Sequence, residues 1–345
     1  MLVCYILIFI LLCGGVSVSK AGFYNDYIDK KQCDSIKGVF ILVVFIRHIY
    51  PYIVESGYEM MSFFDSVGSK IDCMIGQQLV VMFLFYSGYG VMESIKKKGK
   101  DYVTNIPKHR ILPTLLNFDV AVFSFIILDL ALDISKPLDI TLLAFTGWTS
   151  VGNSNWYIFV IVTCYILNYF AFTIKMNKSY VYGGWGLLIL TFALLLLLSR
   201  TREVWWYNTI MCYPAGAMFS VYKQCIERFV HERYWTCLII AIVTFIILFN
   251  IGKDCAAIRY NILSINFTAI IVMFTMKVKI GNRLLEYFGK NLFPLYIYQR
   301  LPMILLATIC NGIIPKEYTA AYITSCFFIT ILITYFYKYW QICIK

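Results

Sequence analysis

The sequence predicts an all-α polytopic membrane protein, in which a transmembrane helical bundle of ten core helices follows one extra N-terminal helix. Sixty per cent of the 345 residues are hydrophobic and only 14% are charged, with a mean hydropathy of +0.73. These values exclude an ordinary soluble domain. The hydrophobic residues also fall into blocks of about 17 to 23, each long enough to cross a bilayer.

Taken in chain order, the blocks predict eleven helices, at about 2–19, 36–54, 72–94, 114–132, 155–174, 182–199, 204–222, 235–251, 258–276, 291–309 and 319–339. The polar segment from Lys20 to Lys37 separates the first helix from the rest. We therefore divide the chain into residues 1–35, an N-terminal transmembrane helix with a cytoplasmic linker, and one membrane domain at 36–345. No basic residue precedes the first apolar run, which favours a retained helix over a signal peptide.

The distribution of Lys and Arg supports this topology. With the loop after the first helix in the cytoplasm and the sides alternating, 21 of the 30 basic residues face the cytoplasm and 7 face outside, while Arg47 and Arg300 lie within blocks. This asymmetry follows the positive-inside rule. It predicts an external N-terminus and a cytoplasmic C-terminus.

The positions of the charged residues and of the cysteines argue against a nucleic-acid-binding protein and against a metal-binding protein. The net charge of +11 resides in short loops between apolar blocks, so we attribute it to membrane topology and expect no nucleic-acid partner. The 12 cysteines show no CxxC spacing, and several lie inside apolar blocks. We therefore expect reduced, buried thiols and no metal site.

The most informative stretch runs from Asp34 to Pro51. If it is a helix, His48 lies 11 residues beyond Lys37, roughly 16 Å along the axis and about half the thickness of a bilayer core. Arg47 and His48 at that depth are costly and mark a functional site by default. A neutral imidazole accepts a proton from a hydroxyl, so His48 is a candidate general base. The alternative is a buried histidine that bonds a neighbouring helix.

Further basic residues suggest a site for an anionic ligand. The stretch from Lys96 to Arg110 holds several cations able to pair with phosphates, such as those of coenzyme A. Topogenic charge and attraction to anionic lipid are the alternatives. Lys108 and Arg110, next to the following helix, are the better candidates. Arg300 lies roughly 15 Å beyond Lys290 by helical rise, and we expect it to share a wet cavity with Arg47 and His48.

Two other motifs carry small or polar groups. Ser87 and Gly88 allow close approach of a neighbouring helix or a ligand. Asn155, Trp156 and Tyr157 begin a helix at its outer end, where they serve either as an interfacial anchor or as partners for sugar hydroxyls.

Five short elements together resemble one known family. They are the Lys37–His48 spacing, Phe83–Tyr89, Lys108–Pro113, Asn155–Tyr157 and Gly289–Pro302. In this order they resemble the acyltransferase-3 family of integral membrane acyltransferases, which includes O-acetyltransferases of bacterial surface polysaccharides. The ten helices after residue 35 equal the family's core. Lys37 stands where the family has arginine, and Gln299 where histidine is common.

The resemblance implies transfer of an acyl group, usually acetyl, from acetyl-coenzyme A or another acyl-coenzyme A in the cytoplasm. The acceptor is a hydroxyl of a cell-surface glycan or lipid-linked sugar, and the location is the bacterial inner membrane. His48 would take the acceptor's proton or carry the acyl group, with Arg47 or Arg300 stabilising the oxyanion. The remaining expected contacts are with the donor (Lys37, Ser87, Lys108, Arg110) and with the acceptor (Asn155, Trp156, Tyr157, Tyr298, Gln299).

Two alternatives stay open on sequence grounds. A transporter or flippase would use Arg47, His48 and Arg300 as a substrate or proton site, although the sequence has no two-fold repeat of the kind many transporters contain. A catalytically inactive structural partner is the third possibility, because Lys37 and Gln299 depart from the family pattern. The sequence does not indicate an oligomeric state.

Overall fold

The fold is described from a computed structural model covering residues 2–58, 63–175, 179–251, 256–309 and 312–344. Its α-helices are α1 Leu2–Cys13, α2 Lys30–Glu55, α3 Phe63–Ile75, α4 Val81–Lys98, α5 Lys100–Thr104, α6 Leu112–Ala131, α7 Leu138–Ala144, α8 Trp156–Lys175, α9 Tyr180–Thr201, α10 Cys212–Glu232, α11 Tyr234–Asn250, α12 Ala256–Lys277, α13 Arg283–Lys290, α14 Leu292–Tyr298, α15 Arg300–Ile309, α16 Ile313–Glu317 and α17 Thr319–Ile344. Short helical turns η1 Gly76–Val80, η2 Pro107–Ile111 and η3 Val204–Trp206 and two strands, β1 Val16–Val18 and β2 Val278–Ile280, complete it.

The predicted all-α membrane bundle is confirmed. By length and composition, eight helical segments of the described residues can cross a membrane, or nine if α10 and α11 form one bent span. The eight are Lys30–Glu55, Gly76–Lys98, Pro107–Ala131, Trp156–Thr173, Tyr180–Thr201, Ala257–Lys277, Leu292–Ile309 and Thr319–Tyr339. Each of the eleven apolar blocks contains a helix, but the structure differs from the predicted spans at α1 and at α10 with its bend into α11.

The first difference is α1, which has 12 residues. At 1.5 Å per residue it is about 18 Å long, too short to cross a bilayer core alone. Gly14 and Gly15 end it, and Gly15 has a φ of +122°, which favours glycine. Residues 16–18 then pair antiparallel with β2, Val16 opposite Ile280, so the helix predicted at 2–19 is shorter than expected.

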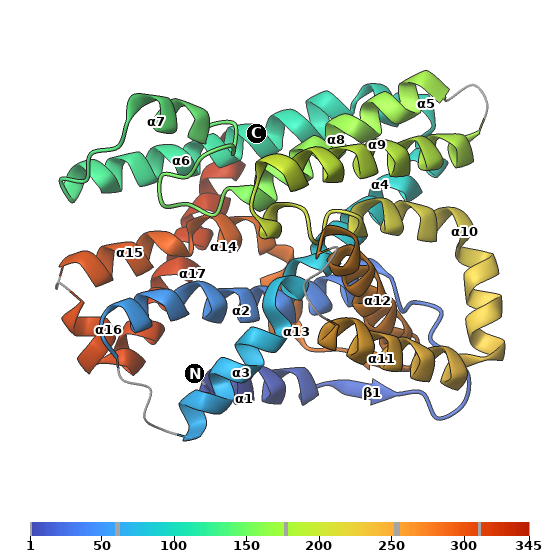
Figure 1. Cartoon of the computed structure of the whole chain (residues 1–345), viewed down its shortest axis with the longest axis horizontal. Helices are drawn as coiled ribbons and strands as arrows, with labels where there is room; N and C mark the ends of the chain where they lie inside the picture. The colour runs from blue at the N-terminus through green and yellow to red at the C-terminus, as the bar shows by residue number, and fades with distance from the viewer. Residues whose placement is uncertain (1, 59–62, 176–178, 252–255, 310–311, 345) are drawn as a thin grey trace.

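The second difference is at α10 and α11. Helix α10 begins at Cys212 rather than at residue 204. Pro214 lies in its first turn, where the backbone N–H that proline lacks would have no partner within the helix. Tyr222 leaves helical geometry, with φ −103° and ψ 16°. α10 then meets α11 at an angle of 99°. In Figure 1 the second part of α10 runs across the end of the bundle before α11 turns back into it.

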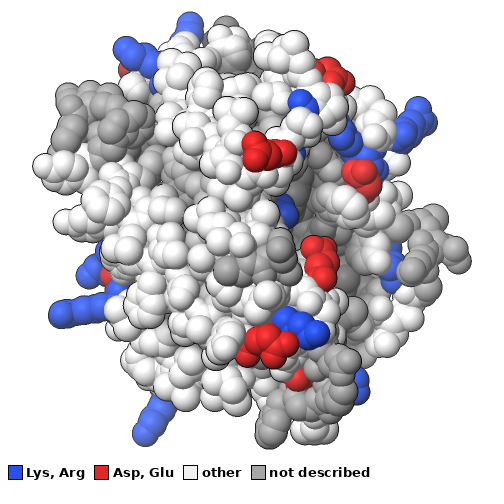
Figure 2. Space-filling view, turned by 90° about the vertical axis from the view of Figure 1, so that its left-hand side faces the viewer, with Lys and Arg blue, Asp and Glu red and all other residues white. Residues whose placement is uncertain are grey.

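The bundle has two chemically different ends. In Figure 1 most long helices run side by side from left to right, with α5 at the right and α7 and α16 at the left. We call the right-hand end, with Lys96, Lys97, Lys98 and Lys100, the lysine-rich end. Figure 2 views the opposite end, whose surface is mostly uncharged, with acidic and basic side chains near its middle and further Lys and Arg side chains around its edge.

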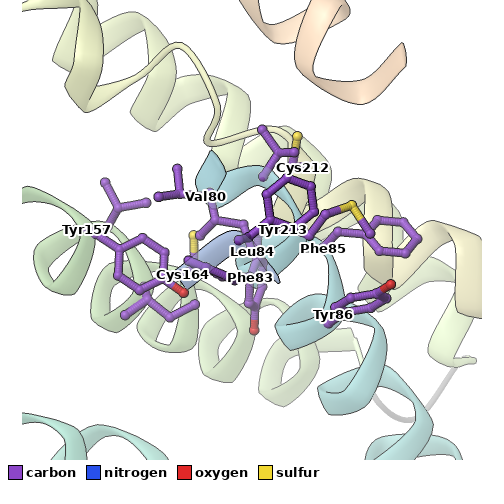
Figure 3. Close-up of a cluster of buried hydrophobic side chains, with 14 of the residues drawn as sticks. Val80, Phe83, Leu84, Phe85, Tyr86, Tyr157, Cys164, Cys212 and Tyr213 are labelled. Atoms are coloured by element: carbon purple, nitrogen blue, oxygen red, sulfur yellow. The ribbon is translucent and has the colours of Figure 1, made fainter. Parts of the chain in front are cut away.

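Helix α4 lies at the centre of the bundle. In the membrane-spanning segment Gly76–Lys98, which α4 forms with η1, 72% of the most hydrophobic stretch is buried. Figure 3 shows its side chains between α8 and α10: the ring centroids of Phe83 and Tyr157 are 6.2 Å apart. A Cβ at Gly88 would overlap the carbonyl group of Tyr213, so the two backbones touch. Gly88 therefore serves helix packing, which was one of the two predicted roles.

Helix α13 fixes the beginning of α2 in the same way. A Cβ at Gly38 would overlap the carbonyl oxygen of Leu285, and a Cβ at Gly289 would overlap that of Asp34. The carbonyl groups of α2 and α13 thus lie directly against the glycines of the other helix. This contact sets the position of the turn that carries Lys37.

The linker before α2 is tied to β2 by an exposed ion pair. Lys279 donates a hydrogen bond to the carboxylate of Asp26, and both side chains are 44% exposed. That hydrogen bond lowers the pKa of Asp26 and raises the pKa of Lys279. Backbone bonds from Ser19 to Lys277 and from Tyr24 to Met276, each 2.9 Å, hold the same segment.

Candidate active site

Two cavities lie on either side of an aromatic wall beside α2. We call the first the inner cavity. It has a volume of about 280 Å³ and is lined by Lys37, Ser87 and Arg110 together with apolar and tyrosine side chains. The second, the outer cavity, has a volume of about 290 Å³ and is lined by Arg47, His48, Arg300, Gln77 and Trp156 among others. Both approach the size of small-molecule sites in proteins.

Helix α2 connects the two cavities. Asp29 caps it by accepting a hydrogen bond of 2.7 Å from the backbone of Gln32, and the helix continues without a break to Glu55. His48 therefore lies 11 residues beyond Lys37, roughly 16 Å along one axis, as the sequence predicted. One helix presents a lysine to the inner cavity and a histidine to the outer cavity.

The outer cavity combines one histidine with two arginines. Arg300, the first residue of α15, donates from Nε to the hydroxyl of Tyr52 over 3.1 Å. The Nδ1 atom of His48 is buried and has no hydrogen-bond partner within the described chain. Its ring lies 5.9 Å from that of Tyr296. A base flanked by two guanidinium groups suits a reaction that removes a proton and develops negative charge.

The inner cavity contains cations and hydroxyl groups. Lys37 Nζ lies 2.6 Å from Asp34 Oδ1, and the Asp34 side chain is only 3% exposed. Ser87 and Tyr165 share a hydrogen bond of 3.0 Å. Arg110 donates from Nε to the hydroxyl of Tyr102 over 3.0 Å, and the terminal nitrogens of a guanidinium are suited to binding an anion.

A third cavity adjoins the inner one. It has a volume of about 300 Å³ and shares Arg110, Thr114, Tyr165 and Phe293 with the inner cavity. Its other lining residues include His109, Lys290 and Lys338, so we call it the basic cavity. Phosphate groups could bind there, next to the inner cavity, by charge-assisted hydrogen bonds. Among the described residues no cluster of His, Cys, Asp and Glu could hold a metal ion.

Most of the residues predicted from sequence meet at these cavities. Arg300 shares the outer cavity with Arg47 and His48 although about 250 residues separate it from them. Lys37, Ser87 and Arg110 share the inner cavity. Trp156 lines the outer cavity and Tyr157 the inner one.

Four predicted residues line neither the inner nor the outer cavity. Lys108 is exposed. Asn155 caps α8, because its carbonyl accepts from the Phe159 amide at 3.1 Å and its side chain donates to Gly147 at 2.8 Å. These positions give Lys108 and Asn155 surface and capping roles in the fold.

The other two are Tyr298 and Gln299, both buried in the core. Tyr298 packs on Tyr337, with 5.8 Å between ring centroids. Gln299 donates to the carbonyl of Tyr296 over 3.2 Å within its own turn. Its side chain lies among residues of α2 and α17 such as Phe45 and Phe327, away from His48. Gln299 is therefore not part of the lining of the outer cavity.

Sequence reasoning missed several site residues, all of them partners of the predicted ones. The hydroxyl of Tyr52 accepts a hydrogen bond from Arg300, and that of Tyr102 accepts one from Arg110. The hydroxyl of Tyr165 shares a hydrogen bond with Ser87. With 27 tyrosines in the chain, no local pattern separates these from interfacial anchors. Asp34 carried a signal, because a carboxylate three residues before a lysine on a helix is a neighbour of it.

One of three comparisons with known proteins gives a match. A family model described as an acyltransferase domain matches residues 30–339, from the first residue of α2 into α17. Neither curated proteins nor solved structures give a match to the chain. Since the family model covers nearly the whole chain, this protein belongs to the acyltransferase-3 family of membrane acyltransferases.

Proposed function

We propose that the protein transfers an acyl group, in the simplest case acetyl, from acyl-coenzyme A to a hydroxyl of a glycan or lipid-linked sugar. The donor binds at the lysine-rich end and the acceptor enters from the opposite end. The observation that carries this proposal is that His48 lies in a cavity separated by one aromatic wall from a second cavity with Lys37 and Arg110. By the positive-inside rule the lysine-rich end faces the cytoplasm of a bacterium and the outer cavity faces outside its inner membrane.

The residues present fit coenzyme A as a substrate. Its phosphates carry several negative charges, and the basic cavity offers His109, Lys290 and Lys338 beside Arg110. Its narrow arm combines amide and methylene groups, which match the mixed hydroxyl and apolar lining of the inner cavity. The thioester at the end of that arm would then lie against the aromatic wall, close to His48.

In the direct reaction, the imidazole of His48 accepts the proton of the acceptor hydroxyl. The hydroxyl oxygen attacks the thioester carbonyl carbon, a C–O bond forms, the C–S bond breaks, and the sulfur leaves as a thiolate that takes up a proton. Arg47 or Arg300 stabilises the negative charge on the carbonyl oxygen. In the alternative route, His48 itself first accepts the acyl group and then passes it to the hydroxyl.

The test is transfer of radiolabel from [¹⁴C]acetyl-coenzyme A to candidate sugars by the purified full-length protein. We expect His48→Ala to lower transfer by about 10²- to 10⁴-fold, the usual contribution of a general acid–base group. Mixing with donor alone, followed by rapid separation of the protein at neutral pH, distinguishes the two routes, because only the acyl-carrier route leaves label on the protein.

The matched control is His231→Ala, since His231 stacks on Phe23 with 4.0 Å between centroids, outside the cavities described above. We expect its transfer rate to match the wild type. Unchanged transfer in His48→Ala would overturn the mechanism. Movement of an unmodified substrate through proteoliposomes, with no acyl transfer to any acceptor, would favour a transporter instead.

A further inference from the structure

Tyr296 is the one described residue that lines both the inner and the outer cavity. It comes from α14, and its side chain is buried, with only 3% of the residue exposed. All other lining residues of these two cavities face one cavity or the other. Among the described residues, Tyr296 is therefore the side chain that borders both cavities, and it forms part of the wall between them.

Neighbouring rings hold that phenol in place. Tyr157 meets it edge to face, with 5.2 Å between centroids and 62° between planes, a favourable aromatic geometry. His48 lies on its other side at 5.9 Å. Trp156 and Tyr157 are consecutive, yet they line opposite cavities, so the beginning of α8 lies at the level of the wall.

We propose that Tyr296 is a positioning residue that partitions the donor site from the acceptor site. This inference deepens the proposed function and rests on it for the reaction itself. In this proposal the acyl carbonyl reaches His48 past the edge of the ring, and the ring keeps water that enters the outer cavity away from the rest of the donor. Such exclusion matters because water competes with the sugar hydroxyl for the thioester, and a closed site suppresses this hydrolysis.

The partition is tested first without any catalysis, by labelling single introduced cysteines with a charged, membrane-impermeant maleimide. Ser87→Cys reports on the inner cavity and Gln77→Cys on the outer cavity. The reagent is added to sealed vesicles on the side from which Gln77→Cys becomes labelled. Peptide mass spectrometry reads the introduced cysteine alone, so the native cysteines do not contribute.

With Tyr296 present, we expect Gln77→Cys to be labelled from this side and Ser87→Cys to be protected. In Tyr296→Ala the protection of Ser87→Cys is lost, whereas Tyr296→Phe, which keeps the ring, retains it. Tyr296→Leu is a second variant that removes the ring with a smaller loss of volume. The matched control is Tyr322→Ala, because Tyr322 is equally buried and lines neither cavity.

Several results would overturn the partition. They are labelling of Ser87→Cys from this side while Tyr296 is intact, continued protection in both Tyr296→Ala and Tyr296→Leu, and loss of protection in Tyr322→Ala. None of these requires acyl transfer, so they are distinct from failure of the proposed function. Where the wild type does transfer, Tyr296→Ala should in addition raise the ratio of acetyl-coenzyme A hydrolysis to transfer, while Tyr296→Phe should not.

Discussion

The imidazole ring of His48 faces the phenol ring of Tyr296, with 5.9 Å between the ring centroids and 55° between the planes. Tyr296 borders the inner cavity as well, where Lys37 lies on the same helix as His48. A base on one side of a wall one ring thick, with cations on the other side, suits a reaction whose two substrates arrive from opposite ends. The distance along α2 is what separates these two chemical environments.

The hydrogen bond from Arg300 to Tyr52 predicts a variant with a purely catalytic defect. Tyr52→Phe removes the hydroxyl that accepts from Arg300 Nε at 3.1 Å and keeps the ring. We expect kcat to fall about tenfold, as for loss of a hydrogen bond to a charged group, because the guanidinium is less well oriented toward the oxyanion. The KM for the donor should stay unchanged, since the inner cavity is untouched.

Steady-state kinetics over a range of donor concentrations measure both constants. Tyr58→Phe is the control, because Tyr58 donates instead to Asp65 over 3.4 Å and does not line the outer cavity. A higher donor KM with normal kcat in Tyr52→Phe would contradict the assignment of Arg300 to the acyl carbonyl.

Arg110 lies where the basic cavity meets the inner cavity, and it predicts a defect of the opposite kind. Arg110→Ala should raise the donor KM by about 10- to 100-fold, the equivalent of one charge-assisted hydrogen bond, with a smaller change in kcat. Arg110→Lys should recover part of the affinity, since lysine keeps the charge and loses the planar fork. Binding of coenzyme A by isothermal titration provides an independent measurement.

The control for Arg110 is Lys98→Ala, which removes one exposed positive charge from the same end of the molecule. If the two variants lose donor affinity equally, then the general field of the lysine-rich end attracts the donor, and Arg110 has no specific contact with it. High salt should also weaken donor binding by the wild type, because exposed charges are screened.

The sequence carried enough information to place His48 and Arg300 together. Each was expected roughly 15–16 Å from a lysine at the cytoplasmic end of its own helix, and both line the outer cavity. Depth along a helix follows from residue counting alone. Rotation about the helix does not, and for this reason Gln299, one residue before Arg300, was expected at the acceptor site and instead faces α2 and α17.

Contacts between distant segments explain the other differences. The helix predicted at 2–19 ends at Cys13 because residues 16–18 pair with residues 278–280, a partner that no local pattern reveals. The wall formed by Tyr296 and Tyr157 likewise joins α14 to α8. The hydropathy pattern predicts both helices, but it does not predict which of their tyrosines come into contact.

The Asp26–Lys279 pair predicts a pH-dependent contribution to stability. The pKa of Asp26 is lowered in the folded protein, so its contribution is present above the unfolded pKa and is lost as the pH falls through the folded value. The raised pKa of Lys279 means that its part is lost only at strongly alkaline pH. Since both side chains are half exposed, Asp26→Asn should cost about 0–1 kcal/mol at neutral pH.

Thermal unfolding in detergent, compared between the wild type and Asp26→Asn, measures this contribution. The difference in midpoint should shrink as the pH falls below about 4, the ordinary pKa of an aspartate, and vanish below the lowered pKa of Asp26 in the folded protein. A difference that persists or grows in acid would mean that Asp26 acts through something other than its charge.

Lys37 is expected to contribute both to the stability of the fold and to donor binding. It forms an ion pair of 2.6 Å with Asp34, and the second carboxylate oxygen of Asp34 is buried without a hydrogen-bond partner in the described part of the chain. Lys37→Arg should therefore be tolerated, because a guanidinium can bind both oxygens. Lys37→Ala should destabilise the protein by about 3–5 kcal/mol, since it leaves a buried carboxylate without a counter-charge.

The double variant Lys37→Ala with Asp34→Asn separates these two effects. It removes both charges, so the midpoint of thermal unfolding should return most of the way to that of the wild type. The KM for the donor should remain raised, because no cation then faces the donor from α2. If neutralising Asp34 restores the donor KM as well, Lys37 serves only to balance Asp34, and the donor must bind through the cations of the basic cavity alone.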